Sequence, residues 1–179
     1  MMNNNKQNVI FVPIMSPIAP ARPVEKGQPF PMEYVKWHKA LVNYFSNRED
    51  CNFIWKGFFL PNQGFDLISR IINDKNYSNI KFRTDNFIRY IKMADKIIFD
   101  QPSAAFFECI FSGIPILGLY RPEDQRLRGN AYNSFGSSLK PYNNIEEGIN
   151  LVKKFIDGNS SDYIVNFDPG NDSLNSIFD

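Results

Sequence analysis

The sequence is poor in the residues that hold metal ions or form disulfide frameworks. It has two cysteines, Cys51 and Cys109, and one histidine, His38, among 179 residues. Two cysteines so far apart make neither a zinc motif nor a disulfide framework, and no His/Cys/Asp cluster has metal-ligand spacing. We therefore expect no metal site and two ordinary packed thiols. We expect a structural role for His38, which lies beside Trp37 without a nucleophile motif.

The sequence also lacks a strong net charge and a long uninterrupted apolar run. Twenty basic side chains against nineteen acidic ones leave a formal charge of +1, so the surface as a whole attracts neither nucleic acid nor anionic lipid. The longest apolar run, Phe106 to Tyr120, is interrupted and shorter than the roughly 20 residues of a membrane span. The first residues contain no apolar signal core. We expect a reduced cytoplasmic setting without a transmembrane segment, and leave peripheral attachment to the inner membrane open.

Apolar runs and helical patterns alternate along most of the chain. Apolar residues make up 43% of the sequence and aromatic residues 15%, enough for the core of one domain over residues 1–179, with its body at 8–167 and a tail at 168–179. We expect strands at 8–14, 52–56, 79–83, 96–100 and 114–120, helices at 32–47, 62–73, 85–94, 102–112 and 145–157, and a strand-like piece at 163–167. The proline-rich stretch 15–31 reads as a loop. The alternation predicts an α/β fold, a Rossmann-like parallel sheet doubly wound into three layers.

Polar residues gather after the expected strand that ends at Asp100. In an open parallel sheet, ligands bind outside the carboxyl ends of the strands. Gln101-Pro-Ser-Ala104 begins the next helix, and a proline at the first helical position would leave the amides of Ser103 and Ala104 without internal partners. Those amides, the Ser103 hydroxyl and the positive helix end suit a diphosphate. The alternative is that Gln101 and Ser103 only cap the helix.

Glu108 lies within a helix that has almost no other polar residue. Its neighbours are Phe106-Phe107 and Cys109-Ile-Phe111, and a carboxylate in such company usually has a partner. A ribose diol, held by two carboxylate oxygens, would be one such partner. The alternative is a solvent-facing glutamate on the exposed stripe of the helix.

Residues 94–117 resemble the C-terminal nucleotide-binding domain of GT-B glycosyltransferases. The shared pattern is Ala94-Asp95 before a strand, Ser103 at the next helix start, Glu108, and Gly113-Ile-Pro115 before another strand. The resemblance implies that the backbone near Ser103 holds phosphate and that Glu108 holds ribose. It also implies an N-terminal acceptor domain, for which this chain has no room. The chain is then either a fragment or works with another domain or subunit.

Within this family, the segment from Asp85 to Asp157 is similar to the glycerophosphotransferases of teichoic-acid synthesis and to other surface-carbohydrate transferases. The features that carry this likeness are Tyr120, Glu123-Asp124, Arg128-Gly129 and a helix that begins Asn144-Ile-Glu-Glu. One feature departs from it. Those phosphotransferases usually carry His-Pro after the second strand, whereas this sequence reads Trp55-Lys-Gly-Phe-Phe59, in which Lys56 is the only charged residue.

Cationic side chains follow two of the expected strands. Arg121, Arg126 and Arg128 come after the strand that ends at Tyr120, where guanidinium groups could clamp a diphosphate. The alternative is that they pair with Glu123 and Asp124. Lys56 ends another strand at the same edge and is a candidate for binding phosphate, with an ordinary solvated lysine as the alternative. The predicted nucleotide-binding residues are Lys56, Gln101, Ser103, Ala104, Glu108, Tyr120, Arg121 and Arg128.

Three functions agree with these features. The first is half of a two-domain transferase of bacterial surface-polysaccharide synthesis, whose nucleoside-diphosphate-linked donor is a substrate, so that no cofactor is needed. The second is half of a UDP-sugar epimerase, which shares the fold. The third is a non-catalytic α/β interaction module, since one fold serves many functions. We expect the first, and the sequence points to no catalytic residue.

Overall fold

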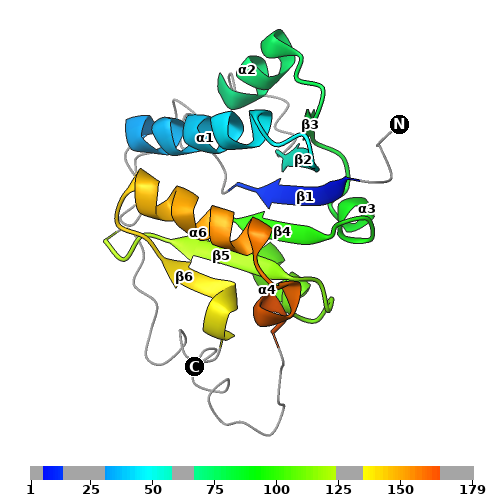
Figure 1. Ribbon diagram of the computed structural model, residues 1–179, viewed down its shortest axis with the longest axis vertical. Coiled ribbons are helices and arrows are strands. Elements are labelled where there is room, and N and C mark those ends of the chain that lie inside the picture. Colours follow the sequence, from blue (N-terminus) through cyan, green and yellow to red (C-terminus); the bar gives the residue numbers. More distant parts are fainter. Residues whose placement is uncertain (1–5, 14–30, 58–66, 124–134, 166–179) are drawn as a thin grey trace, which may run out of the picture.

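The computed structural model describes residues 6–13, 31–57, 67–123 and 135–165. These residues contain a six-stranded sheet (Figure 1). The strand order is β3-β2-β1-β4-β5-β6, and every neighbouring pair is parallel. The strands are β1 (Gln7–Val12), β2 (Cys51–Lys56), β3 (Ile80–Arg83), β4 (Lys96–Phe99), β5 (Ile116–Tyr120) and β6 (Leu139–Pro141). This confirms the predicted parallel α/β sheet.

Helices cover both faces of the sheet and make the three layers that the alternation predicts. The helices are α1 (Pro31–Ser46), α2 (Leu67–Lys75), α3 (Ile88–Ile91), α4 (Ala104–Ile110) and α6 (Ile145–Asp157), with short 3-10 turns η1 (Gly136–Ser138) and η2 (Ser160–Tyr163). Side chains of α1, α2 and α6 join one hydrophobic cluster, and those of α3 and α4 join a second. None of the described helices is long and apolar enough to cross a membrane.

The strands are almost wholly apolar because both of their faces are buried. In β1, Val9 and Phe11 belong to the cluster under α1 and α6, whereas Ile10 and Val12 belong to the cluster under α4. Every residue of β2, β4 and β5 is buried. A continuous apolar run therefore predicts a covered strand, and the sequence interpretation of these strands holds within two or three residues at each end.

Two elements differ from the sequence predictions. β6 was not predicted, because three residues are too few to show a periodic pattern. Lys140 is partly exposed, and Pro141 ends the strand. The strand-like piece predicted at 163–167 is wrong for residues 163–165, none of which is in a strand. Tyr163 ends the turn η2 instead and packs its ring against Phe155 at a centroid distance of 4.7 Å. Residues 166 and 167 lie outside the described residues, as do most of the predicted loop at 15–31, the tail at 168–179 and the start of the helix predicted at 62–73.

Candidate functional site

The strand order reverses between β1 and β4, and this reversal positions the site. The helix that follows β1 is α1, on one face of the sheet, and the helix that follows β4 is α4, on the other. The helices that follow β1 and β4 therefore lie on opposite faces of the sheet, and open α/β sheets bind their ligands in the crevice at such a switch point. Asp100 and Arg121 directly follow β4 and β5, so both lie at this edge.

A buried carboxylate links the end of β4 to α1. The hydroxyl of Tyr34 donates to Asp100 Oδ2 at 2.6 Å, and Nε2 of His38 lies 2.9 Å from the same oxygen. The side chain of Asp100 is only 1% exposed. The ring of His38 also meets Trp55 and Phe11 edge-on. The single histidine is thus a buried partner of Asp100.

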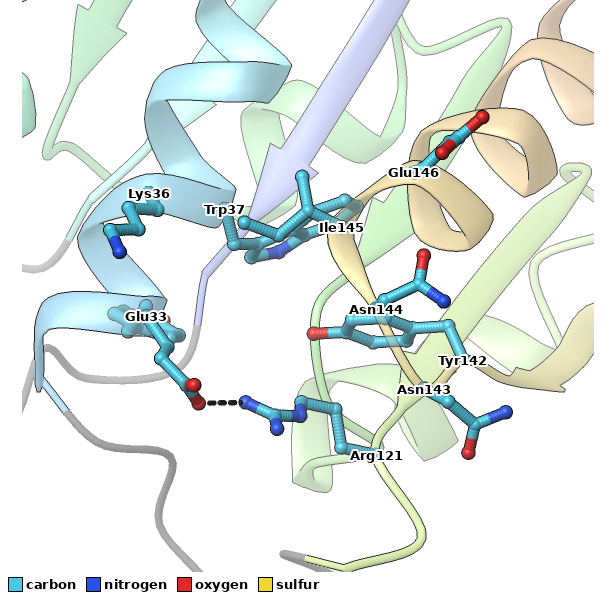
Figure 2. Close-up of a pocket in the computed structure, with 10 residues that line it drawn as sticks. Glu33, Lys36, Trp37, Arg121, Tyr142, Asn143, Asn144, Ile145 and Glu146 are labelled. Carbon is cyan, nitrogen blue, oxygen red and sulfur yellow. Dashed lines mark hydrogen bonds and ion pairs between the residues drawn. The ribbon is translucent and has the colours of Figure 1, made fainter.

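A pocket of about 500 Å³ opens between the N-terminal ends of α1 and α6 (Figure 2). Its residues come from the first turns of α1, the end of β5, the β6–α6 connection and the first turn of α6: Glu33, Tyr34, Lys36, Trp37, Arg121, Tyr142, Asn143, Asn144, Ile145 and Glu146. Arg121 Nη1 donates to Glu33 Oε2 at 2.7 Å, and its other terminal nitrogen pairs with Glu123. The sequence left open whether Arg121 binds a diphosphate or pairs with an acidic side chain. In the structure it pairs with Glu33 and Glu123.

The N-terminal end of α6 at this pocket is closed by its own side chains. Asn144 is the N-cap and accepts a hydrogen bond from the amide of Glu147 at 2.9 Å, and Glu147 in turn accepts from the amide of Asn143 at 2.8 Å. This reciprocal pair resembles a capping box, except that Glu147 reaches the amide of Asn143 and not that of the N-cap Asn144. With Glu146 and Glu147 in its first turn, α6 does not present its N-terminal end to an anion.

The start of α4 is arranged differently. Ser103 is the N-cap, with extended backbone angles (φ −127°, ψ 175°), and its side chain makes no capping hydrogen bond. The helix begins at Ala104, so the prediction that Pro102 occupies the first helical position is wrong by two residues. The amides without partners inside the helix are consequently those of Ala104 and the two residues after it, since the amide of Phe107 already bonds to the carbonyl of Ser103 at 3.2 Å. Gln101 and Ser103 are partly buried, and Ala104 is exposed.

Glu108 is exposed on the outer face of α4. Phe106, Cys109 and Ile110 point into the core, and Phe111 beyond them is 70% exposed. The apolar sequence neighbours of Glu108 therefore do not surround its carboxylate, and the alternative weighed from the sequence, a solvent-facing glutamate on the exposed stripe of the helix, describes its position. The assignment of Glu108 as the ribose ligand stays a prediction, because a carboxylate that faces outward is able to bind ribose hydroxyls.

The other predicted site residues are spread along the edge. Lys56 ends β2, is buried, and donates from Nζ to the carbonyl of Gly57 at 2.7 Å, so it is not a solvated lysine. Burial lowers the pKa of Lys56, an effect that the nearby Asp85 opposes. Tyr120 is buried in the cluster under α4. Arg126 and Arg128 lie outside the described residues.

Of the predicted binding residues that the structure describes, only Arg121 lines the pocket of Figure 2. Gln101, Ser103, Ala104 and Glu108 belong to the β4–α4 segment, on the other side of the crevice. Sequence reasoning missed the pocket residues on α1, because Tyr34 and Trp37 fit the apolar stripe of an amphipathic helix. No group of three or more metal-ligating side chains comes together within the described residues.

Comparison with solved structures places this arrangement among known folds. Sucrose-phosphate synthase of Thermosynechococcus elongatus matches 92% of the chain at 11% identity with a TM-score of 0.57. MnaA of S. aureus, solved with UDP, matches 89% at 16% identity with a TM-score of 0.54. The trehalose-6-phosphate synthase OtsA matches 89% at 14% identity with a TM-score of 0.53. The fold is the Rossmann-like fold of GT-B glycosyltransferase structures.

This GT-B-like domain spans less than two fifths of the chains that it matches, 39% of the sucrose-phosphate synthase and 38% of MnaA and OtsA. The chain thus matches one part of each of these longer chains. The sequence itself matches no protein-family model and no curated protein. At identities of 11–16%, the likeness is one of fold.

Proposed function

We propose that this chain is the donor-binding domain of a glycosyltransferase-type enzyme. In this proposal it binds a nucleoside-diphosphate-linked donor at the carboxyl edge of the sheet, for glycosyl or polyol-phosphate transfer. Another domain or subunit supplies the acceptor site and the catalytic base. The shared fold, the partial coverage of the matched chains and the presence of UDP in the MnaA structure support this proposal.

One observation carries the proposal: the segment Gln101–Ala104 follows β4 directly at the point where the strand order reverses. At that point the first amides of α4 have no partners inside the helix, and the hydroxyl of Ser103 is not used as a cap. A diphosphate can accept hydrogen bonds from these groups, and its charge is favoured by the positive helix end. Glu108, one turn further along and exposed, is then the proposed ligand of the ribose hydroxyls.

The chemistry that this arrangement supports is electrostatic. Transfer from a nucleotide donor leaves a nucleoside diphosphate whose developing charge must be stabilised, and hydrogen-bond donors fixed in advance do this efficiently. The helix-end amides supply such donors. Arg121 is the nearest described cation after β5, and releasing its ion pairs with Glu33 and Glu123 would let it turn to a phosphate.

The biological setting belongs to the same proposal. The similarity of the segment from Asp85 to Asp157 to surface-carbohydrate transferases favours a role in bacterial surface-polysaccharide synthesis. We propose that the domain works in the cytoplasm, where it meets its donor, and at the inner membrane if the acceptor is carried by a lipid.

Calorimetric titration of the chain with UDP, CDP and GDP tests the function. The proposal predicts saturable binding of a pyrimidine nucleotide, UDP or CDP, with weaker binding of GDP. Heat with none of the three would reject the donor site and favour the non-catalytic interaction module. For a two-domain enzyme, conversion of a UDP-sugar to its epimer without any acceptor would indicate the epimerase alternative instead of transfer.

A further inference from the structure

Two side chains of α1 converge on one oxygen atom at the end of β4. Tyr34 and His38 are four residues apart, and therefore lie on the same face of the helix. The Tyr34 hydroxyl is 2.6 Å and His38 Nε2 is 2.9 Å from Asp100 Oδ2. Tyr34 is 4% exposed, His38 3% and Asp100 6%, so these contacts are shielded from water.

Asp100 connects the two sides of the crevice. Its side chain is held by α1, on one face of the sheet, while its main chain continues into Gln101–Ala104, the segment that leads to α4 on the other face. Tyr34 also lines the pocket of Figure 2. The pocket wall and the proposed phosphate-binding segment are thus joined through a single buried carboxylate.

We propose that Tyr34 and His38 are positioning residues for the donor site, and that they act through Asp100. This inference rests on the proposed function. By holding the Asp100 carboxylate, the two side chains fix the main chain that follows it, so that the amides after Ser103 are aimed at the diphosphate before it binds. A site whose supporting contacts are fixed in advance loses less conformational entropy on binding.

The arrangement is more than packing, because a buried carboxylate needs partners. An isolated ionised carboxylate in an apolar interior is strongly unfavourable, and the buried Asp100 carboxylate contacts the Tyr34 hydroxyl and the His38 ring. Removing one hydroxyl takes away one of its partners without creating a cavity. The main chain at Gln101 then loses part of its constraint at the place where the proposed ligand binds.

Substituting Tyr34→Phe tests the inference, and Tyr44→Phe is its matched control. Tyr44 is on the same helix, and its hydroxyl accepts a hydrogen bond from Arg48 Nη1 at 2.7 Å, near the opposite edge of the sheet. Each substitution removes one hydroxyl from α1, and with it the hydrogen bond to Asp100 or the one from Arg48. Both variants should lose thermal stability, but only Tyr34→Phe should weaken UDP binding, by about three- to tenfold, the range of one net hydrogen bond.

Equal affinity for UDP in Tyr34→Phe and the unsubstituted chain would overturn the inference and leave the proposed function intact. An equal loss of affinity in Tyr34→Phe and Tyr44→Phe would also overturn it, because stability alone would then explain both. Failure of the unsubstituted chain to bind UDP, CDP or GDP is a different result, which rejects the proposed function and removes the site that the inference needs.

A second measurement needs no substitution. Because His38 is the only histidine, the proton on its Cε1 gives the single signal of that kind in a proton NMR spectrum. Saturating UDP should shift this signal, since ordering of the segment after Asp100 alters the carboxylate that His38 contacts. An unchanged His38 signal at saturation, with clear changes elsewhere in the spectrum, would overturn the proposal that His38 acts on the donor site through Asp100.

Discussion

The ammonium group of Lys96 donates a hydrogen bond to the carbonyl of Phe155 at 2.6 Å. It also lies 2.9 Å from the carbonyl of Ile156 and 3.4 Å from that of Gly158, and the residue is 1% exposed. Lys96 begins β4, and the carbonyls of Phe155 and Ile156 belong to the last turn of α6, where they have no partners inside the helix, while Gly158 is the C-cap that follows. A cation at a helix C-terminus also meets the negative end of the helix dipole. Lys96 therefore links the C-terminal end of α6 to β4, a central strand of the sheet.

Substituting Lys96→Met should destabilise the domain by about 1–3 kcal/mol. Methionine keeps the length of the side chain but leaves the buried carbonyls of Phe155 and Ile156 without their charged donor. Urea unfolding, followed by circular dichroism, measures the change. The exposed Lys153 on the same helix supplies the control, and Lys153→Met should alter stability by less than about 0.5 kcal/mol. Similar values for the two variants would show that Lys96 contributes no more than a surface lysine.

The two buried thiols should make the domain less stable at alkaline pH. Burial raises the pKa of Cys51 to about 11 and that of Cys109 to about 12, from an ordinary value of 9.0. Below pH 9 the thiols are protonated in both states, and their contribution to stability is complete. Above pH 9 they ionise in the unfolded chain only, so the free energy of unfolding falls until the pH reaches the raised pKa values.

At pH 10.5 the loss should be about 2 kcal/mol for each thiol. Urea titrations at pH 8 and pH 10.5 should therefore show a smaller difference for Cys109→Ala than for the unsubstituted chain. An identical difference in both proteins would mean that Cys109 ionises equally in the folded and unfolded states.

Gly148 lets α6 approach the ring of Trp37 closely. A Cβ atom at this position would lie 2.8 Å from Cζ3 of Trp37 and 3.1 Å from Cδ2 of Tyr142. Gly148→Ala should destabilise the domain by about 1–2 kcal/mol, since overpacking outweighs the gain in helix propensity. Adding Trp37→Phe gives the new methyl group space, so thermal unfolding of the double variant should show a loss smaller than the sum of the single losses. Additive losses would argue against this contact.

The sequence predicts the sheet well because strand burial leaves a local pattern. Cys51–Lys56 is buried at every position, and so are the strands that start at Lys96 and Ile116. Each strand therefore reads as a short apolar run, and the helices between them show helical spacing. Parallel pairing follows from the alternation of the two. By contrast, Leu139–Pro141 is too short to show any period.

The buried contacts of the site were harder to predict. The partner of His38 is Asp100, 62 residues away, and nothing in the neighbourhood of His38 indicates a carboxylate. The position of Glu108 illustrates a different error. Its immediate neighbours are apolar, but Phe106, Cys109 and Ile110 have the spacing of an inward-facing helix stripe, and Glu108 does not share it. Helical spacing, rather than local composition, would have indicated that this carboxylate faces outward.

The affinity of the Glu108→Ala variant for UDP tests the central claim most directly. Glu108 is proposed to hold the ribose, and loss of its charged hydrogen bonds should weaken binding by about 1–3 kcal/mol, or roughly five- to 150-fold. The matched control is Glu49→Ala, an exposed glutamate at the opposite edge of the sheet, which should bind like the unsubstituted chain. If calorimetry shows that Glu108→Ala binds UDP as tightly as the unsubstituted chain, the donor does not lie along α4.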